Sequence, residues 1–173
     1  KRGWNIKWAA SAHPKNILIC NNDELDLIKE SGCSRILIGA ESGNDDELKY
    51  IKKNMTKENV IEVANRLGKR EIHGSFTVIV GYPGFPEENI DRTLDFGRML
   101  REISSLHEIK AHIYAPYPGT PLYEDSIRHG FAPPKTLEDW AQYDYYEAQT
   151  PWLRDGLTER VRDFNRKYCP YVL

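Results

Sequence analysis

Four short runs rich in β-branched and apolar residues alternate with helix-like segments along this chain of 173 residues. The runs cover residues 4–10, 35–40, 72–81 and 108–117. Strands that alternate with helices pair in parallel, because each crossover helix returns the chain to the same edge of the sheet. The order therefore predicts an α/β fold with a parallel sheet and right-handed crossovers.

Helix ends are marked by capping residues. Asn21 with Glu24, and Asn44 with Glu47, have the spacing of a capping box. Pro86 is suited to the first position of a long helix. The expected helices cover residues 22–32, 44–54, 56–68, 86–103 and 157–168, with a further short helix before residue 130.

Composition excludes several classes of protein. The formal net charge is −2, which argues against a general binder of nucleic acids or membrane surfaces. No apolar run reaches the roughly 18 residues of a membrane span. The cysteines, Cys20, Cys33 and Cys169, are few and far apart, which is typical of the cytoplasm and offers no metal-binding motif. The chain begins with Lys1, as a processed or partial polypeptide would.

Candidate ligand positions follow from the sheet. Ligands of parallel α/β proteins bind at the carboxyl ends of the strands. These ends fall at residues 9–13, 39–43, 80–84 and 115–120, and three of the four are rich in Gly and Pro. Each alone is explained by a tight turn, whereas three at one edge favour a shared site.

Glu41 and Lys53 carry the most chemistry among these positions. A carboxylate at the end of a buried strand needs hydrogen-bond donors, and a pair of ribose hydroxyls would supply them. The alternative is a salt bridge with Lys49 or Lys53. Lys53 has the point charge that suits a ligand carboxylate, although a solvated surface lysine is the alternative.

Other residue types give weaker signals. Cys33 follows a helix end and is expected to pack in the core. Among the histidines, His73, His107 and His129 are expected at the surface, and His112 is placed to point into a barrel. The sequence contains no P-loop, GxGxxG or HExxH motif.

Three segments together resemble the radical S-adenosylmethionine (SAM) superfamily, especially its subgroup with an N-terminal cobalamin-binding domain. They are SGCSRILIGAESGNDDELKYIKKNMTKENV, FTVIVGYPGFPEENIDRTLDF and IYAPYPGTPLYEDSIRHG. The resemblance covers residues 4 to 130. It implies a partial TIM-type (βα) barrel, in which a CxxxCxxC loop holds a [4Fe-4S] cluster and SAM is reductively cleaved to a 5′-deoxyadenosyl radical.

The CxxxCxxC loop is missing from this chain. The resemblance therefore implies strands three to six of the barrel over residues 1–130, with the cluster ligands upstream. Residues 131–173 would form a C-terminal tail or lid. We expect the chain to be part of a longer enzyme, inactive alone.

The resemblance also assigns residues to SAM. Glu41 matches the polar residue that contacts SAM at its ribose, with Ser42 as its motif partner, and Lys53 lies where a basic residue meets the SAM carboxylate. Gly81 and Pro83 match the turn on the adenine side.

Some departures and gaps accompany these assignments. Thr77 replaces an acidic ribose ligand found in some relatives. No catalytic residue is assigned, and no metal ligand. Cobalamin is a candidate further cofactor, used by relatives that mostly methylate unactivated carbons. Expected partners are the missing N-terminal part, a small-molecule substrate and an electron donor such as ferredoxin or flavodoxin.

Three alternatives remain open. The chain could be a SAM- or nucleotide-binding module without a cluster, or a half-barrel enzyme with Glu41 as general base. It could also be an interaction domain with an aromatic docking surface, although the same aromatic residues suit a lid. They are Trp140, Tyr143, Tyr145, Tyr146 and Trp152.

Overall fold

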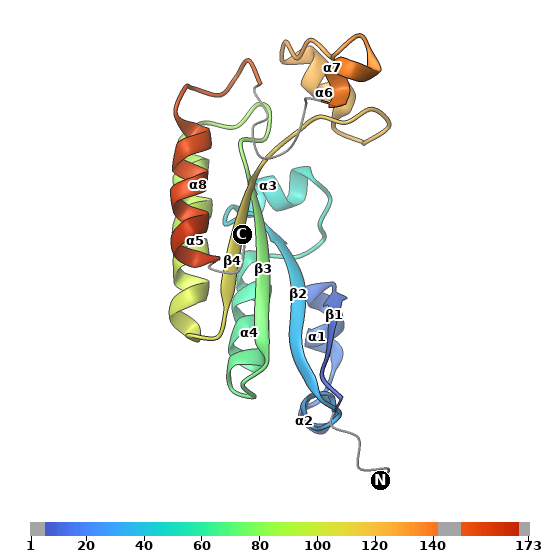
Figure 1. Cartoon of the computed structure of the whole chain (residues 1–173), viewed down its shortest axis with the longest axis vertical. Helices are drawn as coiled ribbons and strands as arrows, with labels where there is room; N and C mark the ends of the chain where they lie inside the picture. The colour runs from blue at the N-terminus through green and yellow to red at the C-terminus, as the bar shows by residue number, and fades with distance from the viewer. Residues whose placement is uncertain (1–5, 142–149, 170–173) are drawn as a thin grey trace.

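One parallel sheet organises the chain in the computed structural model, which describes residues 6–141 and 150–169. The sheet has four strands in the order β1-β2-β3-β4, and every neighbouring pair is parallel (Figure 1). The strands are β1 (Trp8–Ala12), β2 (Cys33–Glu41), β3 (His73–Val80) and β4 (Glu108–Ile113). The predicted α/β class is confirmed.

Helices follow the strands and cover one face of the sheet. They are α1 (Pro14–Ile19), α2 (Asn22–Glu30), α3 (Asp45–Tyr50), α4 (Lys57–Gly68), α5 (Glu88–Ile103), α6 (Tyr123–Arg128), α7 (Leu137–Ala141) and α8 (Leu157–Tyr168). Helices α4, α5 and α8 pack against β3 or β4. Helices α6 and α7 lie beyond the carboxyl ends of the strands (Figure 1).

Alternation along the strands separates a core face from an inner face. Side chains of the core face are buried against α4, α5 and α8; in the strands they are Ile36, Ile38, Ala40, Phe76, Val78, Val80, Ile109, Ala111 and Ile113. On the other face Leu37 is 39% exposed, and Thr77 and Ile79 are half-buried. This second face corresponds to the inner face of the predicted barrel.

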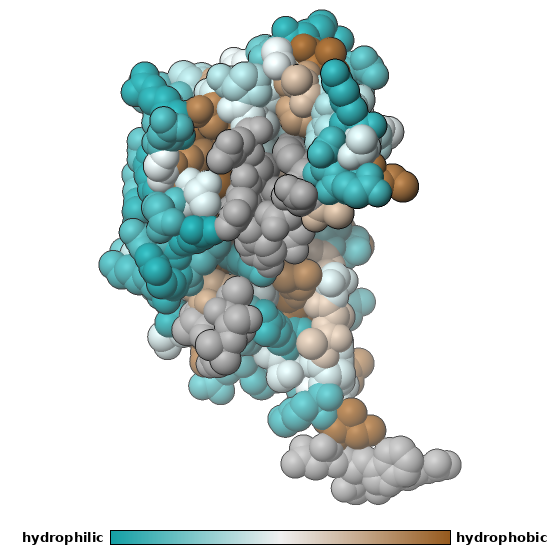
Figure 2. All heavy atoms as spheres, turned by 45° about the horizontal axis from the view of Figure 1, so that its top comes forward, coloured by the Kyte–Doolittle hydropathy of each residue, from teal (hydrophilic) through white to brown (hydrophobic). Residues whose placement is uncertain are grey.

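Helix α8 joins the same layer although it follows the aromatic tail. Leu157, Val161 and Phe164 are buried in the core. The opposite side of α8 carries charged residues, and Figure 2 shows hydrophilic side chains along the edge of the molecule that α5 and α8 form. The predicted residues Tyr143, Tyr145 and Tyr146 lie outside the described residues.

Several element boundaries differ from the sequence prediction; α3 ends at Tyr50 rather than at residue 54, and β4 ends at Ile113 rather than at residue 117. Strand β1 begins at Trp8, and part of the predicted run, with Trp4, lies outside the described residues. Helix α5 begins at Glu88 rather than Pro86.

Helix α1 was not predicted. Six residues are too few for a periodic signal, and the helix is stabilised by a distant residue, because Arg66 of α4 donates to the carbonyl oxygens of Ile17 and Leu18 at 2.7 and 3.0 Å.

One of the two predicted capping boxes is present. The Asn21 side chain accepts from the Glu24 N–H at 2.9 Å, and Glu24 accepts from the Asn21 N–H at 2.7 Å. The box at Asn44 and Glu47 is wrong. Asn44 accepts from the Asp46 N–H, whereas the Glu47 carboxyl turns into the protein and is only 2% exposed.

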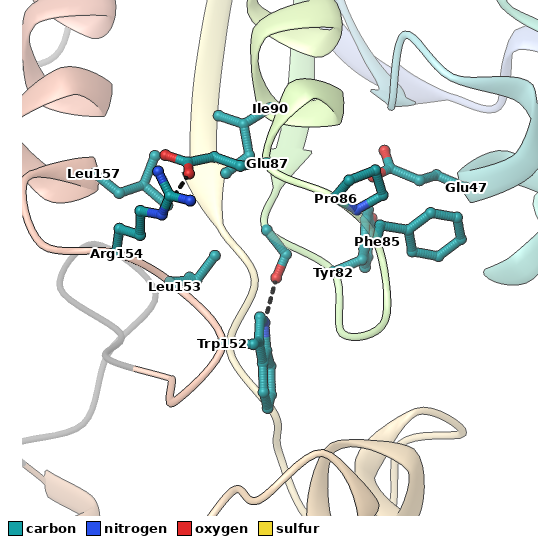
Figure 3. Close-up of a pocket in the computed structure, with 11 residues that line it drawn as sticks. Glu47, Tyr82, Phe85, Pro86, Glu87, Ile90, Trp152, Leu153, Arg154 and Leu157 are labelled. Atoms are coloured by element: carbon teal, nitrogen blue, oxygen red, sulfur yellow. Dashed lines mark hydrogen bonds and ion pairs between the residues drawn. The ribbon is translucent and has the colours of Figure 1, made fainter.

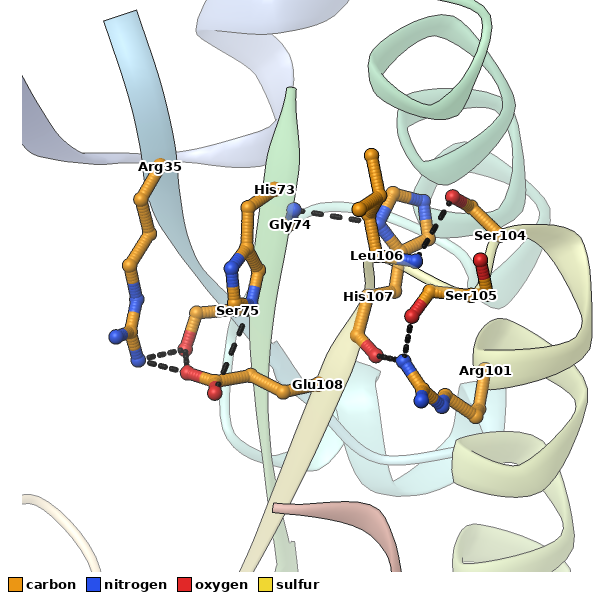
Figure 4. Close-up of polar contacts among 10 residues, drawn as sticks. All are labelled: Arg35, His73, Gly74, Ser75, Arg101, Ser104, Ser105, Leu106, His107 and Glu108. Atoms are coloured by element: carbon orange, nitrogen blue, oxygen red, sulfur yellow. Dashed lines mark hydrogen bonds and ion pairs between the residues drawn. The ribbon is translucent and has the colours of Figure 1, made fainter. Parts of the chain in front are cut away.

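A buried polar layer joins three strands at the amino end of the inner face (Figure 4). The Glu108 side chain is 2% exposed; it accepts from the Ser75 hydroxyl at 2.6 Å and pairs with Arg35. His73 lies with Nε2 3.5 Å from the same carboxyl. Because a buried carboxylate needs donors and opposite charge, this layer fixes β2, β3 and β4 relative to one another.

His107 is fully buried, so its predicted surface position is wrong. Its Nδ1 accepts from the Gly74 N–H at 3.2 Å (Figure 4). Its Nε2 lies 2.9 Å from the Ala64 carbonyl oxygen. These two partners require a neutral ring that carries its proton on Nε2. The ring also meets Phe76 edge-on, 5.2 Å between centroids. Local sequence could not indicate these contacts, because three separate elements make them.

We predict that replacing His107 reduces the loss of stability in acid. Burial lowers the pKa of His107 below its usual value of 6.5. The unfolded chain therefore takes up a proton more readily than the folded chain, and the free energy of unfolding falls as the pH drops below 6.5. In urea titrations between pH 7 and pH 5, His107→Gln should show a shallower decline than the unmodified protein.

Equal declines for His107→Gln and the unmodified protein would contradict the assignment of a buried neutral His107.

Candidate functional site

Glu41 ends β2 in a backbone conformation that is uncommon for a residue with a side chain. Its φ is 62°, in the left-handed region. The register between β2 and β3 shifts between Gly39 and Glu41, which is typical of a β-bulge. Such conformations cost on the order of 1 kcal/mol and concentrate at functional sites, where they aim a side chain.

Lys53 approaches Glu41 from the loop after α3. The loop bends sharply, since Lys52 and Asn54 on either side of Lys53 have φ values of 55° and 53°. The Lys53 Nζ donates to Glu41 Oε1 at 2.7 Å, and the two side chains are 20% and 18% exposed. A partly buried cation and anion thus meet at the carboxyl end of β2.

Gly39 provides the room for this ion pair. A Cβ at position 39 would lie 2.4 Å from Glu41 Oε1 and 3.0 Å from Lys53 Nζ. His13, which caps α1 just after β1, is a neighbour of the pair. Burial lowers the pKa of His13, and the positive charge of Lys53 lowers it further. Residues that follow β1, β2 and α3 therefore converge, as the sequence predicted for the strand ends.

Ser42 lies on the other side of the same loop. It is fully buried, and its hydroxyl donates to the Glu47 carboxyl and accepts from the Asn44 N–H at 2.9 Å. Thr93 of α5 lies 3.2 Å from the same hydroxyl. Burial raises the pKa of Glu47, opposed by hydrogen bonds from Ser42 and Asn89. Ser42 therefore ties the loop to α5, and its predicted contact with SAM stays a prediction.

The turn that follows β3 is shaped by two glycines. Gly81 and Gly84 have φ values of 82° and 79°, which favour glycine. Between them, Tyr82 and Pro83 are buried. Behind the turn lies a cavity of about 240 Å³. Residues at the start of α5 line it together with Trp152, Leu153, Arg154 and Leu157 (Figure 3).

A second hollow lies on the inner face beside β4. It has a volume of about 400 Å³, and its mainly apolar lining includes Ile79, His112, Tyr114 and Tyr117. Burial lowers the pKa of His112 to about 4, so the imidazole is neutral at pH 7. His112 thus lies on the inner face, where the sequence suggested it would point.

Two contacts of this region lay outside the sequence prediction. The Trp152 Nε1–H donates to the Gly81 carbonyl oxygen at 3.0 Å. The Tyr50 hydroxyl donates to the Asp125 carboxylate, which joins α3 to α6. Their partners are 71 and 75 residues apart in sequence, so no local signal could have shown them.

The residues that the structure describes contain no group of three metal-ligating side chains. Cys33 and Cys169 are buried and Cys20 is half-buried; the packing role predicted for Cys33 is confirmed. Within residues 6–141 and 150–169, no helix is long and apolar enough to cross a membrane.

Comparison with known proteins gives one family match. The sequence profile described as "Radical SAM superfamily" matches residues 11–97, about half of the chain. This range contains Gly39, Glu41, Lys53 and the turn at 81–84.

Curated relatives include two methyltransferases. An uncharacterized methyltransferase of Pyrococcus horikoshii is 28% identical over 100% of this chain and 36% of that protein. The bacteriochlorophyllide d C-12(1)-methyltransferase of Chlorobaculum tepidum is 32% identical over 70% of this chain and 25% of that protein. The chain thus spans about a third or less of the length of these relatives.

Solved structures with the same fold belong to radical SAM enzymes. Coproporphyrinogen III oxidase of Escherichia coli aligns with a TM-score of 0.60 at 13% identity, over 94% of this chain and 32% of that chain. The radical SAM methyltransferase TsrM of Kitasatospora setae, which contains cobalamin and a [4Fe-4S] cluster, aligns with a TM-score of 0.56 at 17% identity, over 71% and 22%. These similarities confirm a partial radical SAM barrel fold.

We predict that two glycine substitutions reduce the free energy of unfolding to different extents. In Gly39→Ala the new Cβ meets only the ends of flexible side chains, so the free energy of unfolding should change by less than about 1 kcal/mol. In Gly43→Ala the Cβ would lie 2.5 Å from Phe96 Cβ and 2.8 Å from the Arg92 carbonyl oxygen. Because these atoms cannot move freely, Gly43→Ala should lower the free energy of unfolding by about 1–3 kcal/mol.

Urea denaturation of both variants checks this contrast. A loss in Gly39→Ala as large as that in Gly43→Ala would contradict a displaceable ion pair above Gly39.

Proposed function

Because the chain belongs to the radical SAM superfamily, we propose that it is the SAM-holding part of a longer radical SAM enzyme. The complete enzyme reductively cleaves SAM at a [4Fe-4S] cluster whose ligands lie outside this chain. The observation that carries the proposal is the Glu41–Lys53 pair above Gly39, at the strand ends and inside the matched range.

The two charged groups suit the two ends of SAM. The Glu41 carboxylate has acceptor positions for both ribose hydroxyls. The Lys53 ammonium has three donors, so it can bond a ligand carboxylate and still donate to Glu41. Their 2.7 Å contact gives each charge a partner in the absence of ligand. When SAM binds, its hydroxyl and carboxylate groups replace part of this contact.

The cysteines of this chain do not fit the cluster. Cys33 and Cys169 are buried, and no group of three ligands exists among the described residues. In the family, the cluster supplies the electron that cleaves SAM. The part assigned to this chain is to bind and orient SAM.

We extend the proposal to methyl transfer onto a small-molecule substrate, with cobalamin as a further cofactor and ferredoxin or flavodoxin as electron donor. Support comes from the two methyltransferase relatives and from the cobalamin-containing TsrM structure. The substrate would lie against the hollow lined by Ile79, His112, Tyr114 and Tyr117, on the same inner face as the ion pair.

The complete polypeptide tests this proposal. It should carry a CxxxCxxC motif upstream of residue 1, and after anaerobic cluster reconstitution it should bind SAM in equilibrium dialysis. A complete chain that lacks a CxxxCxxC motif and still binds SAM would instead support a binding module.

We predict that Glu41→Gln and Lys53→Met each raise the Kd for SAM about tenfold or more, because each removes a charge-assisted hydrogen bond. Lys49→Met is the matched control; Lys49 is exposed on α3 and should leave the Kd unchanged. The double variant should lose less binding free energy for SAM than the sum of the two single losses, since Glu41 and Lys53 contact each other. An unchanged Kd in both single variants would exclude the assigned site.

A further inference from the structure

The segment that leads into α8 crosses behind the turn at 81–84. Trp152 and Leu153 contact Gly81 from this side (Figure 3). The Trp152 Nε1–H donates to the Gly81 carbonyl oxygen at 3.0 Å, and a Cβ at position 81 would lie only 2.8 Å from Leu153 Cδ2. The first residue of the turn is therefore held by a hydrogen bond and by apolar packing.

The last residue of the turn is held by a second ring. A Cβ at Gly84 would lie 3.0 Å from His129 Nε2. The His129 and Trp152 rings are 6.3 Å apart and meet edge to face at 75°. Both glycines, at which the backbone is most free to turn, thus face members of one aromatic pair.

Both rings are themselves anchored to the fold. On one side, Arg154 pairs with Glu87 at 3.0 Å, and Leu157 enters the core at the start of α8. On the other side, α6, which ends just before His129, is joined to α3 by Tyr50 and Asp125 and to Tyr114 by Ser126, at 3.1 Å. The contacts of Trp152 and His129 therefore link the position of the turn to the positions of α6 and α8.

We propose that Trp152 is a positioning residue that holds the 81–84 turn in the conformation required by the adenosine half of SAM. This inference rests on the proposed function and on the resemblance, which assigns Gly81 and Pro83 to the adenine side of SAM. Without the indole N–H, the Gly81 carbonyl loses its partner and the glycine backbone regains alternative conformations. The ligand must then order the turn on binding, which reduces affinity.

Trp152→Phe is the selective variant, because it keeps an aromatic ring and removes the N–H. In the complete reconstituted enzyme, the Kd for SAM and for 5′-deoxyadenosine should rise about three- to tenfold, as expected for one neutral hydrogen bond. The Kd for methionine should stay the same. Trp140→Phe is the matched control; Trp140 lies on α7 and faces Tyr117, and its replacement should change none of the three constants.

The two ligand halves separate positioning from general damage. Lys53→Met should raise the Kd for methionine and leave the Kd for 5′-deoxyadenosine unchanged. This is the opposite of the result expected for Trp152→Phe. Amide hydrogen exchange gives a second measurement that does not need the ligand: residues 81–84 should exchange faster in Trp152→Phe, with an unchanged rate in β2.

Each remaining result overturns a specific statement. Unchanged affinities and unchanged exchange in Trp152→Phe would overturn the role of Trp152 and leave the proposed function intact. If Trp152→Phe raised the Kd for methionine and for 5′-deoxyadenosine equally, the variant would be generally damaged. That result would also overturn the role of Trp152. A complete enzyme that binds no SAM would contradict the proposed function and the inference together.

Discussion

Parallel pairing of β2 with β3 and of β3 with β4 is the constraint on which the site depends. In-register hydrogen bonding brings the ends of the strands to one edge, so the bulge at Glu41, the turn at Gly81 and the start of the Tyr114 segment are neighbours. The helix layer buries one face of this sheet, which leaves the opposite face for polar and ligand-facing side chains. The buried layer around Glu108 fixes the opposite end of the same three strands.

One short loop carries both packing contacts and the ion pair to which the proposed function assigns SAM. On its inner side, Glu41 meets Lys53 in the space that Gly39 leaves open. On its outer side, the Ser42 hydroxyl lies 3.2 Å from the Thr93 hydroxyl of α5, so the loop is anchored to the helix layer. The strained backbone at Glu41 is next to Ser42, whose buried side chain fixes the residue that follows it.

The tail has a comparable double role. Helix α8 completes the core, and the residues just before it reach the turn after β3. In the proposed function, the affinity for SAM at the strand ends depends on how well α6 and α8 pack, because both contact the turn through Trp152 and His129. The residues just before α8 would thus affect SAM binding through the turn at 81–84, without contacting SAM themselves.

The sequence alone determined what depends on near neighbours. Strand and helix periodicity predicted the α/β class, and capping at Asn21 predicted the start of α2. The position of Glu41 after a buried strand predicted the edge of the sheet at which the candidate site is placed. Only the tertiary structure decided that Ser42 points into the protein, that His107 is buried and neutral, and that Trp152 holds Gly81. The physical reason is that periodicity and capping act within one or two turns of chain, whereas burial and these hydrogen bonds depend on elements tens of residues apart.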